Sequence, residues 1–348
     1  LLKADLSSMA NSNKYVPVSG NSNLEISVSD NSVATAFSSD ITINSLATQQ
    51  TLQFSGSSPY TSPTAAIGQG TLTLNLGTWD ASGSAFTNKS TPVTHTVTVD
   101  ANNNTLQGLA SSINALTDIS ASVLQTSAGV YSLVVKSPMG EDNAIQITTA
   151  DADLFDFRAD PTISGTPSNA QKQAASDAEL IVDGITIKRT SNSISNIFSG
   201  YTLDLKGETD TLTPANFNVT SSLDVDSAFT NAQNLVDRLN LTRNYFDELM
   251  DRGVEDGESG TLSKDPVMKS ISNQIRKLTE TNIVGFGANS RYLSEIGIQT
   301  KRDGTLLINE KSFKEAIEED PSSYDAIFNS SITSSNTNLV LSKTSSSK

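Results

Sequence analysis

The apolar residues of this chain change their spacing once, near Ser222, and that change constrains the fold more than any other feature. Between about residues 23 and 219 they alternate with polar residues, as Leu72, Leu74 and Leu76 do. A period of two is typical of β-strands that bury one face. After Ser222 the apolar residues recur every three or four positions, as one face of an α-helix requires. The chain is therefore predicted to be an α+β multidomain protein.

The β-rich part is predicted to consist of one unit inserted into another. Two stretches that contain serine, proline and glycine, residues 55–70 and 160–175, interrupt the strands. Between them, residues 64–169 carry their own strands and one helix. The flanking residues 31–63 and 170–220 are short for two independent sheets. Because the ends of a domain often lie close together, we predict two nested, sandwich-like β-rich domains.

The helical part is predicted to contain two helices and a β-hairpin. Apolar residues spaced by three or four in 225–250 and 266–278 indicate two helices, and the polar loop between them indicates an antiparallel pair. Aspartate and glycine at 303–304, between two apolar runs, predict a hairpin. We assign residues 1–30 and 221–348 to this helical domain.

The composition argues against most kinds of catalytic and ligand-binding site. With 23 Lys and Arg against 38 Asp and Glu, the net charge is −15 at pH 7, which opposes binding to nucleic acid or anionic lipid. Cysteine is absent and His95 is the single histidine, so disulfides, thiolate metal sites and most hydrolytic triads are excluded. No run of about 18 apolar residues occurs, so no bilayer-spanning segment is predicted. We predict a protein that is not an enzyme and that has no cofactor and no metal.

Two short segments are compatible with a site but are explained more simply. His95 lies in an alternating segment without a neighbouring nucleophile, so we interpret it as a strand residue. Residues 100–104 have oxygen ligands at the first, third and fifth positions of a calcium loop, but Thr105 and Ser111 stand where glycine and an acid are required. We interpret 100–104 as a strand-to-helix connection, with Asn104 as the helix cap.

Four segments resemble a known family. The two most specific are 178–206 (AELIVDGITIKRTSNSISNIFSGYTLDLK) and 293–313 (LSEIGIQTKRDGTLLINEKSF). Residues 41–50 (ITINSLATQQ) and 105–114 (TLQGLASSIN) occur in the expected order before them. All four are similar to segments of the flagellar hook-associated protein 2 family, whose members cap the bacterial flagellar filament.

The resemblance implies a function in assembly. Family members form small homo-oligomeric rings at the filament tip and promote the insertion of exported flagellin. It implies flagellin, hook–filament junction proteins and an export chaperone as partners, with host surface ligands for some members. It also implies an extracellular location, reached through the flagellar type III export system without a cleaved signal. In these terms the β-rich domains are heads and the helical domain is a leg, whose terminal coiled-coil segments we expect to be missing from this chain.

The predicted contacts between subunits fall in the head and in the leg. In the segment 190–201 an alternative is that the apolar residues form the sandwich core. The candidate interface residues are Ile194, Phe198, Tyr201, Phe229, Val236, Ile271 and Ile275. A bacterial surface adhesin built from β-sandwiches is the alternative function; it explains the polar strands but gives the helical domain no purpose.

Overall fold

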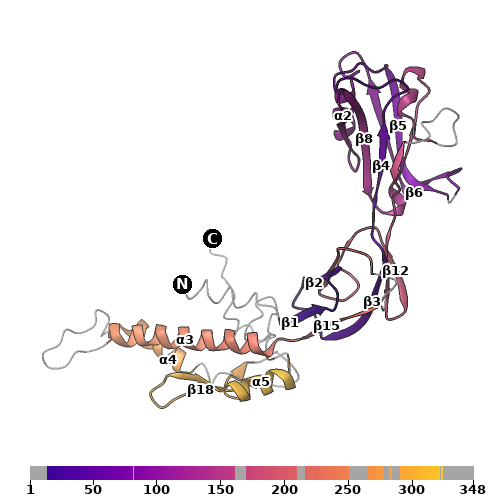
Figure 1. The fold of residues 1–348 in the computed structure, drawn as a ribbon. Helices are drawn as coiled ribbons and strands as arrows, with labels where there is room; N and C mark the ends of the chain where they lie inside the picture. The colour runs from indigo at the N-terminus through magenta and orange to yellow at the C-terminus, as the bar shows by residue number, and fades with distance from the viewer. Residues whose placement is uncertain are drawn as a thin grey trace.

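The computed structural model describes residues 14–80, 82–160, 170–209, 216–250, 265–277, 282–283, 291–321 and 323. These residues form an elongated molecule with a β-rich unit at one end, a helical unit at the other and a second β-rich unit between them (Figure 1). Among the described residues, we call 48–173 the outer unit, 14–47 with 174–223 the middle unit, and those from 224 onward the helical unit. Each unit has a separate buried apolar core, so the predicted α+β multidomain fold is confirmed.

The outer unit is built from two antiparallel sheets around one core, with strand orders β10-β4-β8-β7 and β6-β5-β9. Successive side chains of a strand point to opposite faces, and Leu72, Leu74 and Leu76 of β5 are accordingly at most 1% exposed. The elements are β4 (Gln49–Phe54), β5 (Gly70–Trp79), β6 (Phe86–Val99), α2 (Leu106–Asn114), β7 (Ser120–Ser127), β8 (Val130–Met139), β9 (Ala144–Thr148) and β10 (Gln171–Gln173), with 3-10 turns η1 (Glu141–Asn143) and η2 (Ala152–Phe157).

Helix α2 closes the outer core. It buries Leu106, Leu109 and Ile113 completely or nearly so and contacts β7 and β8. Its N-cap is Thr105, whose hydroxyl accepts the N–H of Gly108 at 3.0 Å. The helix is confirmed, but the predicted Asn104 cap is wrong, because Thr105 occupies the extended position that precedes the first helical residue.

The middle unit pairs a five-stranded sheet, β1-β15-β3-β11-β12, with a three-stranded sheet, β13-β14-β2. Ile41, Ile43 and Leu180 fill the core between them and are 0% exposed. Asp183 and Gly184 both have positive φ, 49° and 83°, as a two-residue hairpin turn requires. The strands are β1 (Tyr15–Ser19), β2 (Leu24–Val28), β3 (Phe37–Ser45), β11 (Ala178–Val182), β12 (Ile185–Arg189), β13 (Ser193–Ile194), β14 (Tyr201–Leu205) and β15 (Phe217–Leu223).

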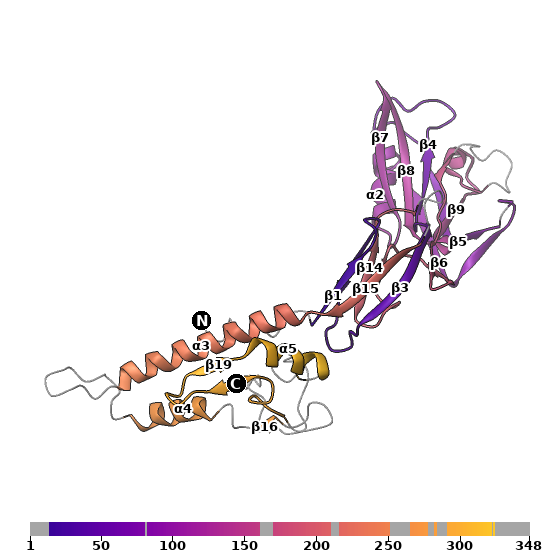
Figure 2. The same ribbon diagram turned by 60° about the horizontal axis from the view of Figure 1, so that its bottom comes forward.

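The helical unit packs its helices beside a short hairpin (Figure 2). The predicted hairpin is confirmed: Ile298 faces Ile308 and Thr300 faces Leu306. No helix among the described residues is long and apolar enough to cross a membrane. The elements are α3 (Val225–Met250), α4 (Pro266–Arg276), β16 (Asn282–Ile283), β17 (Arg291–Tyr292), β18 (Ile298–Thr300), β19 (Leu306–Ile308) and α5 (Glu310–Glu319).

Strand pairing moves two of the predicted boundaries. Strands β1 and β2 pair with β15 and β14, so residues 14–30 belong to the middle core and not to the helical domain. Strand β4 pairs with β8, and its Phe54 is buried in the outer core, so 49–54 do not belong with the rest of 31–63. The alternation of apolar residues identified β2 as a strand, but such alternation carries no information about which strand it joins.

The position of β4 can be tested by removing a side chain. Phe54→Ala deletes a ring that is 0% exposed and is expected to lower the free energy of unfolding by about 3–5 kcal/mol. Hydrogen exchange should accelerate in residues 60–160 and stay unchanged in 178–205. Leu124→Ala, on an exposed position of β7 in the same unit, is the control and should change stability by less than about 0.5 kcal/mol. Faster exchange confined to the middle unit would contradict the assignment.

Candidate functional site

Three residues predicted at a subunit interface are buried inside the single chain. Ile194 and Tyr201 are 3% and 0% exposed in the middle core, and Val236 is 2% exposed in the core of the helical unit. The Tyr201 hydroxyl donates to the carbonyl of Thr35 at 2.8 Å, and burial raises the pKa of this phenol. A second copy cannot reach these side chains, so the interface prediction is wrong for all three, and for Ile194 and Tyr201 the core alternative is correct.

Three of the other four candidates, Phe198, Phe229 and Ile271, are partly buried. Phe198 stacks on Phe37 with ring centroids 4.1 Å apart. The ring centroid of Phe229 lies 6.2 Å from that of an aromatic residue of α5. Ile271 is half-buried on α4, and the side chain of Ile275 lies outside the described residues. An interface role for these four residues stays a prediction.

The connection between the middle and outer units is the first structural site. The chain crosses between the units twice, through Thr48 and through Ser176. The backbone N–H of each residue donates to the carbonyl of the other, at 2.9 and 3.2 Å, and the two hydroxyls are 2.8 Å apart. The two crossing segments therefore form an antiparallel bridge, which restricts twisting of one unit against the other.

Two loops support this crossing from either side. Asn192, in the middle unit, accepts the N–H of Ala47 at 2.7 Å and donates to its carbonyl at 2.9 Å, so its amide takes the place of a neighbouring strand. In the outer unit, Gly140 lies so close to Thr190 that an added Cβ would be 2.7 Å from the Cβ of that threonine. Only glycine permits this close approach of the two units.

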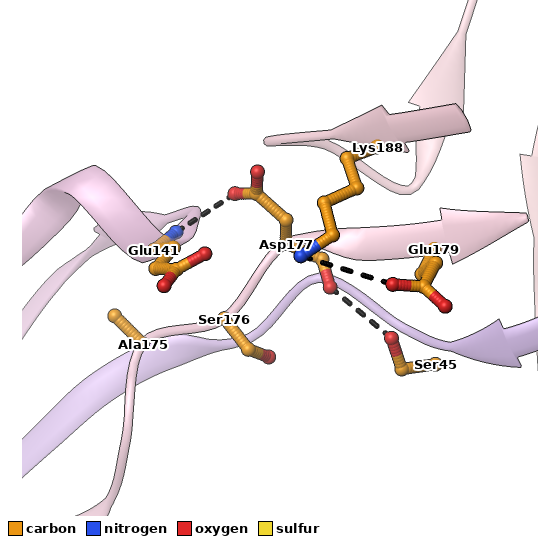
Figure 3. Close-up of a pocket in the computed structure, with 7 residues that line it drawn as sticks. All are labelled: Ser45, Glu141, Ala175, Ser176, Asp177, Glu179 and Lys188. Carbon is orange, nitrogen blue, oxygen red and sulfur yellow. Dashed lines mark hydrogen bonds and ion pairs between the residues drawn. The ribbon is translucent and has the colours of Figure 1, made fainter. Parts of the chain in front are cut away.

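A pocket of about 280 Å³ lies beside the same crossing (Figure 3). Its carboxylates are largely engaged: Asp177 accepts the backbone N–H of Glu141 at 2.8 Å, and Glu179 lies 3.8 Å from the ammonium of Lys188. Within the described part of the chain, no group of three or more histidine, aspartate or glutamate side chains is arranged to hold a metal ion. We therefore interpret the pocket as part of the connection between the units.

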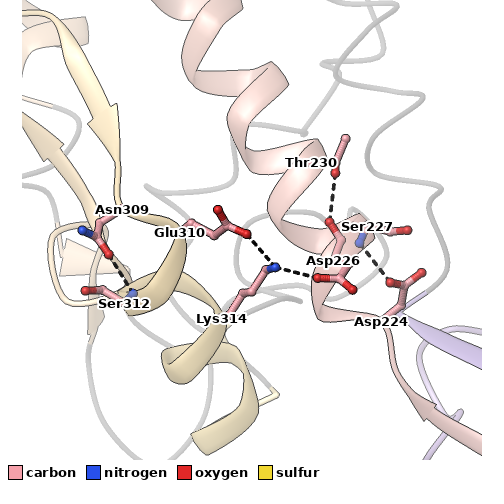
Figure 4. Close-up of polar contacts among 8 residues, drawn as sticks. All are labelled: Asp224, Asp226, Ser227, Thr230, Asn309, Glu310, Ser312 and Lys314. Atoms are coloured by element: carbon pink, nitrogen blue, oxygen red, sulfur yellow. Dashed lines mark hydrogen bonds and ion pairs between the residues drawn. The ribbon is translucent and has the colours of Figure 1, made fainter.

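The second connection lies where the middle unit leads into α3 (Figure 4). Asp224 accepts the N–H of Ser227 at 2.9 Å and caps the helix. Lys314 of α5 lies between Asp226 and Glu310, with N···O distances of 2.6 and 2.7 Å. Two hydrogen bonds raise the pKa of Lys314: the one to Asp226 has the larger effect and the one to Glu310 the smaller. This pair of contacts holds the start of α5 against the first turn of α3.

Two polar residues in the second half of α3 hold the β18–β19 hairpin. Asn240 donates to the carbonyl of Leu306 at 2.9 Å and accepts its N–H at 2.7 Å. Arg243, which is 6% exposed, donates to the carbonyl of Asp303 and lies 3.3 Å from the carboxylate of Asp247. Its Nε and Nη1 are buried, and no described residue forms a hydrogen bond with either atom. The hairpin cannot slide along α3 without breaking bonds to its own backbone.

Sequence reasoning missed these connecting residues. Asn192 and Asn240 act on backbone groups 145 and 66 positions away, and no local spacing indicates such a contact. A partial signal exists only for Lys314, because Glu310 stands four residues before it and such pairs face each other on a helix.

The two other segments considered in the sequence are confirmed as structural. His95 lies on β6 opposite Leu74. In 100–104, Asp100 accepts the N–H of Asn102 at 2.8 Å and donates its own N–H to Asn103 at 2.7 Å. The carboxylate of Asp100 is therefore used within the turn that joins β6 to α2.

Comparison with known proteins places the chain in a class of flagellar components. The family model for the C-terminus of flagellar hook-associated protein 2 matches residues 175–346. The B-type flagellar hook-associated protein 2 of Pseudomonas aeruginosa is 27% identical over 242 residues, 64% of this chain and 50% of that protein. Its Salmonella typhimurium counterpart is 28% identical over 235 residues, 64% of this chain and 48% of that protein. The chain belongs to the flagellar hook-associated protein 2 family and spans about half the length of these relatives.

Solved structures support the fold. The D1-D2-D3 domains of the flagellar cap protein of Escherichia coli match with a TM-score of 0.73 and 24% identity, over 93% of this chain and 85% of that one. The corresponding Pseudomonas aeruginosa protein matches with a TM-score of 0.52 and 23% identity, over 68% of this chain and 100% of that one. At these identities the likeness establishes the arrangement of elements and not the function.

The close approach at the crossing gives a testable prediction. Gly140→Ala combines a positive φ of 105° with a Cβ contact of 2.7 Å, whereas Gly129→Ala has φ 75° and open space around it. Backbone strain alone costs about 1–3 kcal/mol. Gly129→Ala should therefore lower the free energy of unfolding by that amount, and Gly140→Ala should lower it by distinctly more. Denaturant unfolding measures both. Equal losses would mean that the outer and middle units do not press together at this point.

The link between α5 and α3 can be tested through Lys314. Lys314→Met leaves Asp226 and Glu310 without their cation, so hydrogen exchange in α5 should accelerate. Because the pKa of Lys314 is raised above its ordinary 10.5, the link is complete below that pH and is lost only as pH rises through the higher pKa. The difference between wild type and variant should therefore shrink only in strong base. Lys311→Met, whose side chain is 84% exposed, is the control and should leave exchange unchanged.

Proposed function

We propose that this chain is the head and leg of a flagellar filament cap protein. The observation that carries the proposal is membership of the flagellar hook-associated protein 2 family, together with a fold that follows the Escherichia coli cap protein over 93% of the chain. In this proposal the outer and middle units are the heads and the helical unit is the leg. The protein assembles into a ring at the filament tip and promotes the insertion of flagellin.

The proposed work is mechanical and involves no catalysis. A cap must keep its shape while subunits are added beneath it, and the two connections described above suit that requirement. The bridge between Thr48 and Ser176 stiffens the head, and the contacts of Lys314 join α5 to α3. The proposed partners are further copies of the chain, flagellin, the hook–filament junction proteins and an export chaperone.

The proposed location is the tip of the flagellum outside the cell, with export through the flagellar type III system. A chain that folds outside the cell without cysteine needs no oxidative assistance, and this sequence has none. The alternative of a surface adhesin is not supported by the relatives, which are named as flagellar hook-associated proteins. Contact with host surface ligands is proposed only as an addition to the cap function.

Complementation in a strain that lacks its own cap protein tests the proposal. The gene for this protein should restore filaments and should reduce the flagellin lost to the medium, because monomers are then retained under the cap. Flagellin leaking into the medium while the protein is exported would contradict the proposal. Repeating the experiment with flagellin from the same organism excludes a mismatch between cap and filament as the cause.

A further inference from the structure

The edge strands of the β-rich units differ in how they are protected against the addition of another strand. Natural proteins protect such edges with proline, with charge or by covering them. Strand β7 is the last strand of the sheet β10-β4-β8-β7, and its sequence, SASVLQTS, contains neither proline nor a charged residue. The other described edge strands of five or more residues are each protected, by Pro17 in β1, Glu25 in β2, Pro92 in β6, Lys188 in β12 and the backbone of Ala159 beside β9.

Two contacts show which backbone groups of β7 face away from β8. The side chain of Asn114, at the end of α2, accepts the N–H of Ala121 at 2.8 Å and donates to its carbonyl at 2.7 Å, so Ala121 faces outward. Tyr131 of β8 lies opposite Gln125 and donates its N–H to a carbonyl on the other side of β8, so Gln125 faces outward as well. Because bonded and non-bonded residues alternate along an antiparallel strand, Val123 also faces outward.

The second half of this edge is open. Among the described residues, no strand or loop bonds the outward N–H and C=O groups of Val123 and Gln125. Because Ala121 and Val123 pack on the core, Leu124 points to the opposite face of the sheet, and it is 49% exposed. Strand β7 lies at the margin of the outer unit (Figure 2). The edge therefore presents two donors, two acceptors and an exposed leucine, with no charge.

We propose that β7 of one copy pairs antiparallel with β7 of a second copy, about a two-fold axis at Leu124. Val123 of each copy then lies opposite Gln125 of the other. Each of these two residue pairs exchanges two hydrogen bonds, so all the outward groups of both residues are used. The ladder ends at Ala121, whose N–H and C=O are already bonded to Asn114.

The axis favours a second copy over an unrelated strand. Leu124 faces Leu124 of the second copy at a non-hydrogen-bonded position, where the two Cα atoms are about 4.5 Å apart and the side chains are closest. The pairing therefore covers two leucines that are exposed in the single chain. Because β7 is uncharged, two chains of net charge −15 meet without like charges in the ladder. A two-fold contact joins copies in pairs, whereas a ring requires head-to-tail contacts, so this contact is separate from the proposed ring.

Disulfide formation at Leu124 tests the pairing with little background, because the chain contains no cysteine. Concentrated, purified full chain carrying Leu124→Cys is oxidised with copper phenanthroline. Cα atoms about 4.5 Å apart are within the range of a disulfide, so a linked dimer should form. Ser122→Cys, exposed on the same face, is the matched control. Its two copies lie four residues out of register, about 13 Å apart, so it should give at least ten times less dimer. Equal yields, or no dimer from Leu124→Cys, would overturn the proposal.

Proline at position 125 tests the backbone bonds. Gln125→Pro removes an N–H that faces away from β8, so it spares the bonds to β8 and deletes two of the bonds between copies. Added to Leu124→Cys, it should lower the yield of dimer at least tenfold. Gln125→Ala keeps the N–H and should leave the yield unchanged. The same yield from both double variants would refute pairing through the backbone.

Hydrogen exchange provides a test that needs neither cysteine nor proline. In wild type, exchange in residues 120–127 should slow as the protein concentration is raised, because the outward N–H groups become bonded. Leu124→Lys places two ammonium groups against each other at the axis, and like charges directly opposite are destabilising. This variant should therefore show no dependence on concentration. Exchange in wild type that does not change with concentration, or that slows equally in Leu124→Lys, would contradict the pairing.

Discussion

The molecule depends on a double crossing between its two β-rich units. An inserted unit must leave and re-enter its host at neighbouring points, and Thr48 and Ser176 meet this requirement by bonding each other's backbone. Asn192 and the Gly140–Thr190 approach support the same place from both sides. Because two chain segments and two loops meet there, rotation about a single covalent connection is not available. The outer unit is carried as an extension of the middle one.

Stability and shape come from different interactions in this protein. Each unit is held by its own apolar core, since burial of nonpolar surface is the dominant favourable term in folding. The relation of one part to the next is set by hydrogen bonds and ion pairs whose geometry is directional. Asn240 bonds both backbone groups of Leu306, and Lys314 joins α5 to α3. Such contacts add little energy individually, but they decide which arrangement of the units is formed.

Several elements could be predicted from the sequence because their signals are local. Helix α2 and the β18–β19 hairpin follow from apolar spacing and from the Asp303-Gly304 turn. The domain boundaries were less accurate: β2 was identified as a strand but assigned to the helical domain, β4 was grouped with the rest of 31–63, and β1 was not identified. Three of the seven interface candidates are buried for a similar reason, since residues such as Tyr201 and Val236 have the apolar character of a contact surface and of a core alike. The exposure of Leu124 could not be foreseen, because alternation indicates two faces without saying which one is covered.

The sequence by itself determined the α+β composition, the insertion of one β-rich unit in another, the family and the scarcity of groups for catalysis. All of these depend on residue type or on spacing within about ten positions, where the periods of helix and strand operate. Only the tertiary structure decided which strands pair, which apolar residues are buried and which polar side chains join one unit to the next. Those outcomes depend on contacts such as Ala47 with Asn192, 145 positions apart. The local spacing of residues does not reveal such contacts, because the partners of a side chain are selected by the packing of the whole chain.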